Sequence, residues 1–116
     1  MVEIITKRHT NSKDYINRKV SGLYLTAKEE YSEYQIDKTK GIVVYATFKY
    51  VDNDQKSYTW HIGHFKFWSS MTAINNYTNY IKVGKQRFWY KDIIENVDRI
   101  NALIQQEYLK DALEKL

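Results

Sequence analysis

Two apolar-rich runs between residues 41 and 68 decide the fold. They read GIVVYATFKYV (41–51) and SYTWHIGHFKFW (57–68), and the polar segment DNDQK (52–56) joins them. Apolar side chains that alternate with other residues are typical of strands, and a short polar connection between two such runs is typical of a β-hairpin. Residues 41–68 therefore predict a long antiparallel hairpin.

The alternation within each arm predicts which side chains face the core, because successive side chains of a strand point to opposite faces. One face of the first arm is wholly apolar or aromatic: Ile42, Val44, Ala46, Phe48 and Tyr50. In the second arm, one face carries Tyr58, Trp60 and Ile62. The apolar positions then change phase to Phe65 and Phe67, which reach the same side only if the strand bends. Gly63 lies at this switch, so we expect a β-bulge or bend there.

Residues 1–40 carry weaker signals. Residues 1–20 are polar and basic and predict either a basic arm or an edge element. VEIIT (2–6) is typical of a short edge strand. Asn11 or Ser12 is placed to cap one helical turn over residues 15–19. Ser21-Gly22 interrupts the pattern, and GLYLTA (22–27) then alternates as a strand does. The charged stretch that follows predicts either a helix at 28–34 or a strand at 33–36.

The C-terminal third predicts a second hairpin and a helix. A short helix is expected at about 70–76, with Ser69 or Ser70 as its N-cap, followed by strands near 77–83 and 86–90 around Gly84-Lys85. The alternative for residues 70–90 is a helix, because one helical stripe joins Met71, Ile74, Tyr77, Thr78 and Ile81. A long helix should run from Asp92 to about Glu114, because its apolar residues recur at helical spacing. The predicted fold is a single small α+β domain, with an antiparallel sheet built on the hairpin at about 41–68 and a helix at about 92–114 packed on one face.

Composition argues against catalysis. The chain has no cysteine, which excludes disulfides, thiolate zinc sites and thiol nucleophiles, and its four glycines are too widely separated for a phosphate-cradling loop. His61 and His64 point to opposite faces of a strand unless Gly63 forms a bulge, and no third metal ligand is specified. We therefore expect no enzyme activity, no cofactor and no metal site. No apolar run approaches the roughly 20 residues of a membrane helix, so a cytoplasmic protein without a membrane partner is expected.

Charge and aromatic side chains are concentrated in the predicted sheet. Residues 41–90 hold six Lys or Arg against two Asp or Glu, whereas residues 91–116 hold four against six. Thirteen of the eighteen aromatic residues lie between Tyr45 and Tyr90. Exposed rings beside cations suit a contact surface. The predicted contact residues are Lys49, Tyr58, Trp60, His64, Lys66, Trp68, Lys82, Lys85, Arg87 and Trp89.

Two binding functions fit these residues. The leading hypothesis is a non-catalytic protein of phage or mobile-element type that inhibits or modulates a host nucleic-acid-handling complex, such as a CRISPR defence system, by protein–protein contact. The lack of proline and the abundance of Lys, Asn, Ile and Tyr are typical of the AT-rich coding sequences of low-GC bacteria and of their phages and mobile elements. The alternative is direct binding of DNA or RNA, with bases stacked on rings and phosphates on Lys or Arg. Either a monomer or a homodimer is expected, in the cytoplasm of a bacterial host.

Overall fold

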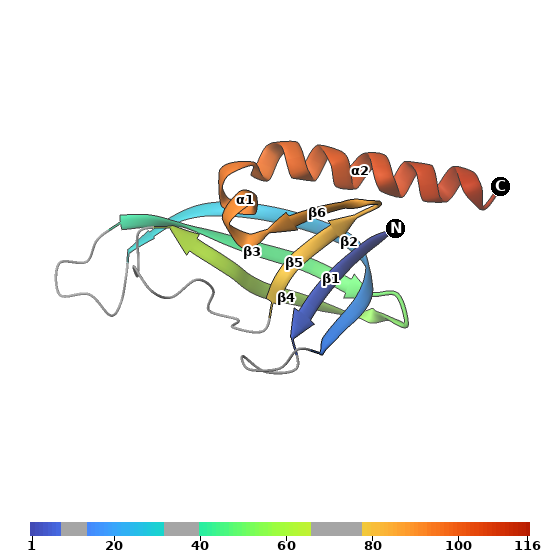
Figure 1. Cartoon of the computed structure of the whole chain (residues 1–116), viewed down its shortest axis with the longest axis horizontal. Coiled ribbons are helices and arrows are strands. Elements are labelled where there is room, and N and C mark those ends of the chain that lie inside the picture. Colours follow the sequence, from blue (N-terminus) through green and yellow to red (C-terminus); the bar gives the residue numbers. More distant parts are fainter. Residues whose placement is uncertain (8–13, 32–39, 66–77) are drawn as a thin grey trace.

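The predicted hairpin is present at one edge of a six-stranded sheet (Figure 1). This computed structural model describes residues 1–7, 14–31, 40–65 and 78–116. Strand β3 (Lys40–Tyr50) pairs antiparallel with β4 (Asn53–Phe65). The chain reverses at Val51 and Asp52, so β4 begins within the predicted connection. The register of the two strands then shifts, because residues 54–56 lie between the pairs Tyr50–Asn53 and Lys49–Ser57.

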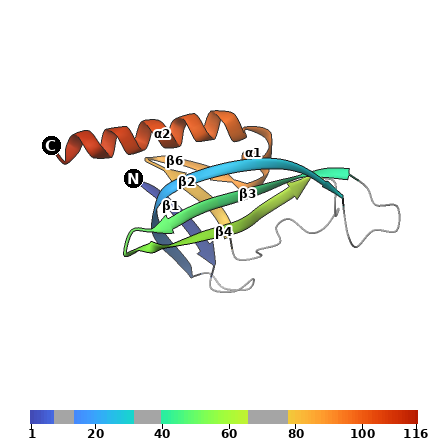
Figure 2. The same ribbon diagram turned by 180° about the vertical axis from the view of Figure 1, so that it is seen from behind.

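All six strands belong to one antiparallel sheet in the order β4-β3-β2-β1-β5-β6. The remaining strands are β1 (Val2–Lys7), β2 (Tyr15–Tyr31), β5 (Thr78–Val83) and β6 (Gln86–Trp89). Two helices follow, α1 (Tyr90–Glu95) and α2 (Val97–Glu114). Strands β1 and β5 cross β3 and β4 at a steep angle, and both helices lie on one side of the sheet (Figures 1 and 2). The predicted α+β architecture, a single small domain with a C-terminal helix on an antiparallel sheet, is confirmed.

Bulges let the long strands bend without ending. Between β2 and β3 the register shifts between Ser21 and Tyr24, next to Gly22, whose φ of 61° is readily adopted only by glycine. Ser21-Gly22 is therefore a bulge inside β2 rather than the predicted interruption. Between β3 and β4, Val44 faces Gly63 but Tyr45 faces His61, so the chain carries an extra residue at the bulge expected near Gly63.

Several N-terminal expectations were wrong. Residues 2–7 form an interior strand, because β5 returns to pair with β1 on the side opposite β2. Residues 15–20 belong to β2 rather than to a basic arm or a helical turn, and residues 28–31 also belong to β2 rather than to a helix. Two further predictions lie outside the described residues. The strand at 33–36 falls within residues 32–39, and the helix at 70–76 falls within residues 66–77.

The predicted long helix is divided at Asn96. Its side-chain amide donates to the carbonyl of Asp92 at 2.9 Å, and its backbone N–H donates to the carbonyl of Ile93 at 3.2 Å. These bonds close α1 after six residues and turn the chain into α2, which runs to Glu114 as expected. The division gives the helical region two axes, so α1 covers the β4 and β6 sides of the curved sheet while α2 follows β2.

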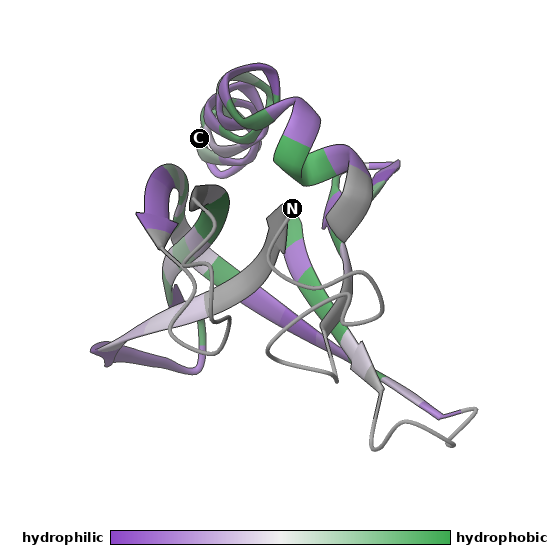
Figure 3. Cartoon of the chain, turned by 90° about the vertical axis from the view of Figure 1, so that its left-hand side faces the viewer, coloured by the Kyte–Doolittle hydropathy of each residue, from purple (hydrophilic) through white to green (hydrophobic). Residues whose placement is uncertain are grey.

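The core lies between the helices and the concave side of the sheet, which curves beneath them in the end-on view (Figure 3). Phe48 is 2% exposed at its centre, and Ile93, Ile100 and Ile104 reach it from the helices. Ile42 differs from the prediction. It is 38% exposed in a groove that Ile94 and Val97 of the helices also line, whereas its neighbour Val43 is fully buried.

Helix α2 also completes one edge of β2. Strand β1 pairs with β2 only over residues 15–19, so the edge beyond has no strand partner there. The Tyr108 hydroxyl accepts the N–H of Leu23 at 3.0 Å and donates to the carbonyl of Val20 at 3.3 Å. The Asn101 amide accepts the N–H of Leu25 at 2.9 Å and donates to its carbonyl at 2.8 Å. Two helix side chains therefore satisfy backbone groups that a neighbouring strand would otherwise bind.

Candidate binding surface

The β5–β6 hairpin presents a basic and aromatic surface on its outer side. Tyr80 pairs with Trp89 and Lys82 pairs with Arg87, so all four side chains point to the same face. Their neighbours Ile81 and Phe88 point to the opposite face and are buried in the core. We call Tyr80, Lys82, Lys85, Arg87 and Trp89 the β5–β6 face.

The rings and one cation of this face are in contact. The centroids of Tyr80 and Trp89 are 4.8 Å apart with the rings tilted by 51°, and the Arg87 guanidinium lies 5.3 Å from the Tyr80 centroid. Trp89 is 44% exposed and Arg87 is exposed. An indole that keeps this much surface in water while resting on another ring is available to a partner at little reorganisation cost.

The position of the hairpin is set by its turn and by helix α2. Gly84 has a φ of 61°, which supports a two-residue connection between Val83 and Gln86. A Cβ at Gly84 would lie 2.9 Å from a carboxylate oxygen of Glu107, so the turn packs closely against α2. Lys85, beside Gly84, is exposed.

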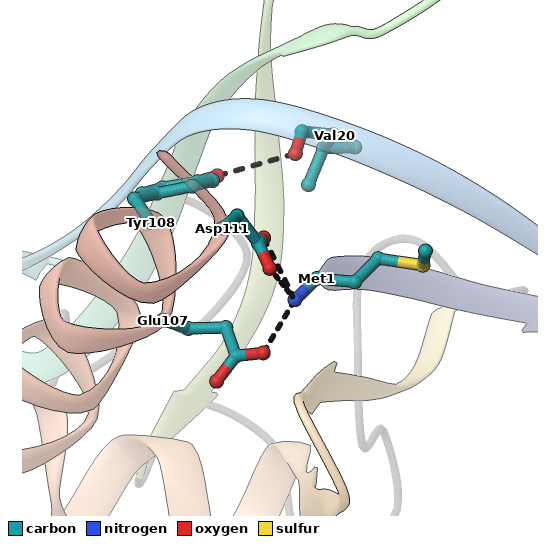
Figure 4. Close-up of polar contacts among 5 residues, drawn as sticks. All are labelled: Met1, Val20, Glu107, Tyr108 and Asp111. Carbon is teal, nitrogen blue, oxygen red and sulfur yellow. Dashed lines mark hydrogen bonds and ion pairs between the residues drawn. The ribbon is translucent and has the colours of Figure 1, made fainter. Parts of the chain in front are cut away.

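Glu107 also binds the amino terminus (Figure 4). The Met1 ammonium donates to Glu107 Oε1 at 2.5 Å and lies 2.8 Å from Asp111 Oδ2. The N–H of Gly84 donates to the Met1 carbonyl at 2.8 Å. Burial lowers the pKa of the Met1 amine, but the hydrogen bonds and charges of Asp111 and Glu107 outweigh it and raise the pKa above its usual 8.0. Strand β1, the β5–β6 turn and α2 are thereby joined at one point.

A row of charged residues crosses the sheet from the β5–β6 face. Lys82 pairs with both Arg87 and Glu3, and Glu3 pairs with Lys19, which places the four side chains on one face of β6, β5, β1 and β2. Neighbouring strands are about 4.8 Å apart, so the row spans roughly 15 Å. Every ion pair shorter than 4 Å among the described residues involves the Met1 amine. Within that part of the chain, Lys82, Lys85, Arg87 and Lys19 therefore have no carboxylate partner at ion-pair distance.

The other predicted contact residues do not join this surface. Lys49 is exposed on the opposite hairpin, at the far side of the sheet. Tyr58 and Trp60 are partly buried against Phe48, with ring centroids 5.7 and 4.9 Å away, on the face opposite Lys49. The backbone of His64 lies in β4, but its side chain, like residues Lys66 and Trp68, lies outside the described part of the structure.

Sequence reasoning thus found four members of the β5–β6 face and missed Tyr80. The alternation in YTNYIKV places Tyr80 in phase with Lys82, and the two-residue turn at Gly84 then brings it opposite Trp89. These two signals together would have identified it.

Neither a metal site nor a membrane helix is found in the part of the chain that the structure describes. No group of three or more His, Asp or Glu side chains there is arranged to hold a metal ion. No helix there has the length and apolarity that crossing a membrane requires. Comparisons with protein-family models, with curated proteins and with solved structures gave no match.

Proposed function

We propose that this protein is a non-catalytic binding protein of phage or mobile-element type, which modulates or inhibits a host nucleic-acid-handling complex by protein–protein contact through the β5–β6 face. The contact of Trp89, Tyr80 and Arg87 carries the proposal. Residues that dominate protein interfaces are enriched in these three types and cluster within a single patch. Lys82 and Lys85 supply a charged rim around that cluster.

The charge of this face favours an acidic partner surface. Its two lysines and one arginine have no carboxylate within ion-pair distance among the described residues. A basic surface accelerates association with an acidic one and disfavours partners of like charge. A defence complex of the bacterial cytoplasm, such as a CRISPR effector, is the kind of target proposed.

A pull-down from nuclease-treated bacterial lysate tests this function. The expected result is a stoichiometric protein band that survives nuclease and is lost with Trp89→Ala. Tyr24→Ala is the matched control, because Tyr24 is an exposed ring (54%) on another part of the sheet. If nuclease removes every band, or if Trp89→Ala retains the same band as the wild type, the β5–β6 face is not a protein-binding surface.

Direct binding of DNA or RNA is the second candidate, favoured by the row formed by Arg87, Lys82 and Lys19 beside the tilted Tyr80–Trp89 pair. Bases stack on exposed rings, and each such contact contributes about 1–3 kcal/mol, while the cations bind phosphates. The presence of Glu3 between Lys82 and Lys19 reduces the net charge of the row.

Fluorescence anisotropy with single-stranded and double-stranded oligonucleotides tests this second function. The logarithm of the affinity should fall linearly with the logarithm of the salt concentration, with a slope of roughly −0.7 per phosphate contacted on a single strand. Removal of one cation by Lys82→Gln should reduce that slope by about one contact. The charge-matched control is Lys110→Gln, at an exposed position on α2. Binding that does not change with salt would exclude this candidate.

A further inference from the structure

A separate groove lies at the end of the sheet where β3 turns into β4. Its volume is about 700 Å³, within the range of roughly 300–1,000 Å³ that small-molecule sites occupy. The lining residues used below are Asn17, Arg18, Lys19, Tyr50, Asn53 and Tyr58. Arg18 pairs with Ile4, which in turn pairs with the buried Ile81, so Arg18 lies on the concave face and not on the β5–β6 face.

Two tyrosine rings form the wall of this groove. The centroids of Tyr50 and Tyr58 are 4.7 Å apart, and the ring of Phe48 stacks on Tyr58 at 5.7 Å with an interplanar angle of 17°. Phe48 and Tyr50 are almost fully buried, which holds the Tyr58 ring in place while Tyr58 itself stays partly exposed. A fixed, partly exposed ring is a surface on which a planar ligand group can stack.

Cations lie next to both rings. The Arg18 guanidinium is 5.2 Å from the Tyr50 centroid, and the Lys56 ammonium is 5.4 Å from the Tyr58 centroid. Burial raises the pKa of Tyr50, and the opposing charge and hydrogen bond of Arg18 do not cancel the rise, so this hydroxyl stays neutral near pH 7. Among the described residues that line the groove, Asp52 is the one carboxylate. No carboxylate of the described residues lies within 4 Å of Arg18, Lys19 or Lys56.

The groove therefore combines three properties that one ligand class shares. Arginine binds phosphate oxygens through paired N–H donors, and the Arg18 guanidinium lies at the groove. The Tyr58 ring offers a stacking surface. The side-chain amide of Asn53 provides both donors and an acceptor for the edge of a heterocycle. The side chains of Asn17 and Lys19 point to the opposite face, because they pair with Ile5 and Glu3.

We propose that this groove binds a nucleotide, with a phosphate on Arg18 and its base against Tyr58. The same chemistry is available from a free mononucleotide and from the phosphorylated end of a nucleic-acid strand. Because the groove and the β5–β6 face lie on opposite faces of the sheet, this site is independent of the function proposed above.

Calorimetric titration with ATP, pyrophosphate and adenosine tests the site, together with amide shifts in ¹H–¹⁵N NMR spectra. ATP should bind more tightly than either fragment and should shift the amides of Asn17, Arg18 and Asn53. Arg18→Gln should weaken ATP binding by at least about tenfold, because charge-assisted hydrogen bonds to phosphate are lost. Lys19→Gln, whose side chain lies on the opposite face of the sheet, and Lys110→Gln on α2 should leave it unchanged.

A thymidine pentanucleotide with and without a 5′-phosphate distinguishes the two sources. Binding of ATP and of the phosphorylated strand indicates that the groove recognises any nucleotide, and binding of the phosphorylated strand alone identifies a strand end. Equal affinity for pyrophosphate and ATP would overturn the role of the base. The site itself is refuted by the absence of heat and shifts with every probe, by shifts confined to the β5–β6 face, or by a folded Arg18→Gln variant that binds ATP as the wild type does.

Discussion

The two hairpins of this sheet contain the same kinds of side chain but orient them differently. In the β3–β4 hairpin, Tyr58 and Trp60 each contact Phe48 on the concave side, and all three contribute to the core. In the β5–β6 hairpin the concave positions are taken by Ile81 and Phe88, which leaves Tyr80 and Trp89 on the outer side. Aromatic content therefore does not predict which rings lie on the outer side of the sheet. The position of each ring in the strand alternation does.

The largest expected effect is a contrast in stability between aromatic residues of the two hairpins. Phe48→Ala should lower the free energy of unfolding by about 3–5 kcal/mol, because it opens a cavity at the centre of the core. Trp89→Ala should lower it by no more than about 1 kcal/mol, because the indole is partly exposed and its main contact is with one other ring. Urea unfolding followed by circular dichroism measures both. Similar losses for the two variants would contradict the assignment of Trp89 to a surface.

The second effect concerns β2, where the two halves of the sheet meet. Asn101→Leu should cost about 2–3 kcal/mol, because the N–H and carbonyl of Leu25 both lose their partner. Amide exchange of Leu25 should accelerate in the variant. The control is Gln106→Leu, at an exposed position of the same helix, which should change stability by less than about 0.5 kcal/mol. Unchanged protection of Leu25 would show that the Asn101 amide does not close this edge.

These contrasts show which parts of the fold were predictable. Alternation identified the hairpin, the in-phase core residues Val44, Ala46 and Phe48, and the strands around Gly84, because local patterning determines each of them. The interior place of β1 was not predictable, because its pairing with β5 joins residues about eighty positions apart. The contacts of Asn101 and Tyr108 with β2 were missed for the same reason, since a polar residue in a helix does not indicate which distant backbone it will bind.

The candidate surfaces divide in the same way. Lys82, Lys85, Arg87 and Trp89 were found because they lie within one short hairpin. Arg18 and Tyr50 were not grouped, because they lie on β2 and β3 and meet only when the strands pair. A sequence pattern identifies neighbours along one strand or helix, whereas a site shared by two elements depends on the register between them.

A smaller effect separates two glycines that share the same backbone conformation. Gly22, in the β2 bulge, and Gly84, in the β5–β6 turn, both have a φ of 61°. Gly22→Ala should cost about 1 kcal/mol, because only the left-handed conformation opposes a Cβ there. Gly84→Ala should cost more, since its Cβ would also displace the Glu107 carboxylate that binds the Met1 amine. Thermal unfolding of both variants measures the difference. Equal losses would indicate that Glu107 moves away without cost.

The smallest effect is a pH dependence that arises where the β5–β6 turn meets β1 and α2. The folded protein raises the pKa of the Met1 amine above 8.0, so it binds more protons than the unfolded chain once the pH exceeds that value. Stability from this contact is therefore complete below about pH 8 and is lost as the pH rises through the higher folded value.

Thermal unfolding between about pH 7 and pH 9 measures this loss, because the pKa of tyrosine is about 10 in the unfolded chain and is raised further in the folded protein at Tyr50, at Tyr108 and, to about 12, at Tyr45. The midpoint of the wild type should fall as the pH rises. In Glu107→Gln/Asp111→Asn the fall should be smaller, since both acceptors of the ammonium have lost their charge. Parallel curves of midpoint against pH for the two proteins would show that the Met1 amine does not stabilise the β5–β6 end of the sheet. The contrast between the β3–β4 and β5–β6 hairpins would then depend only on the orientation of their side chains.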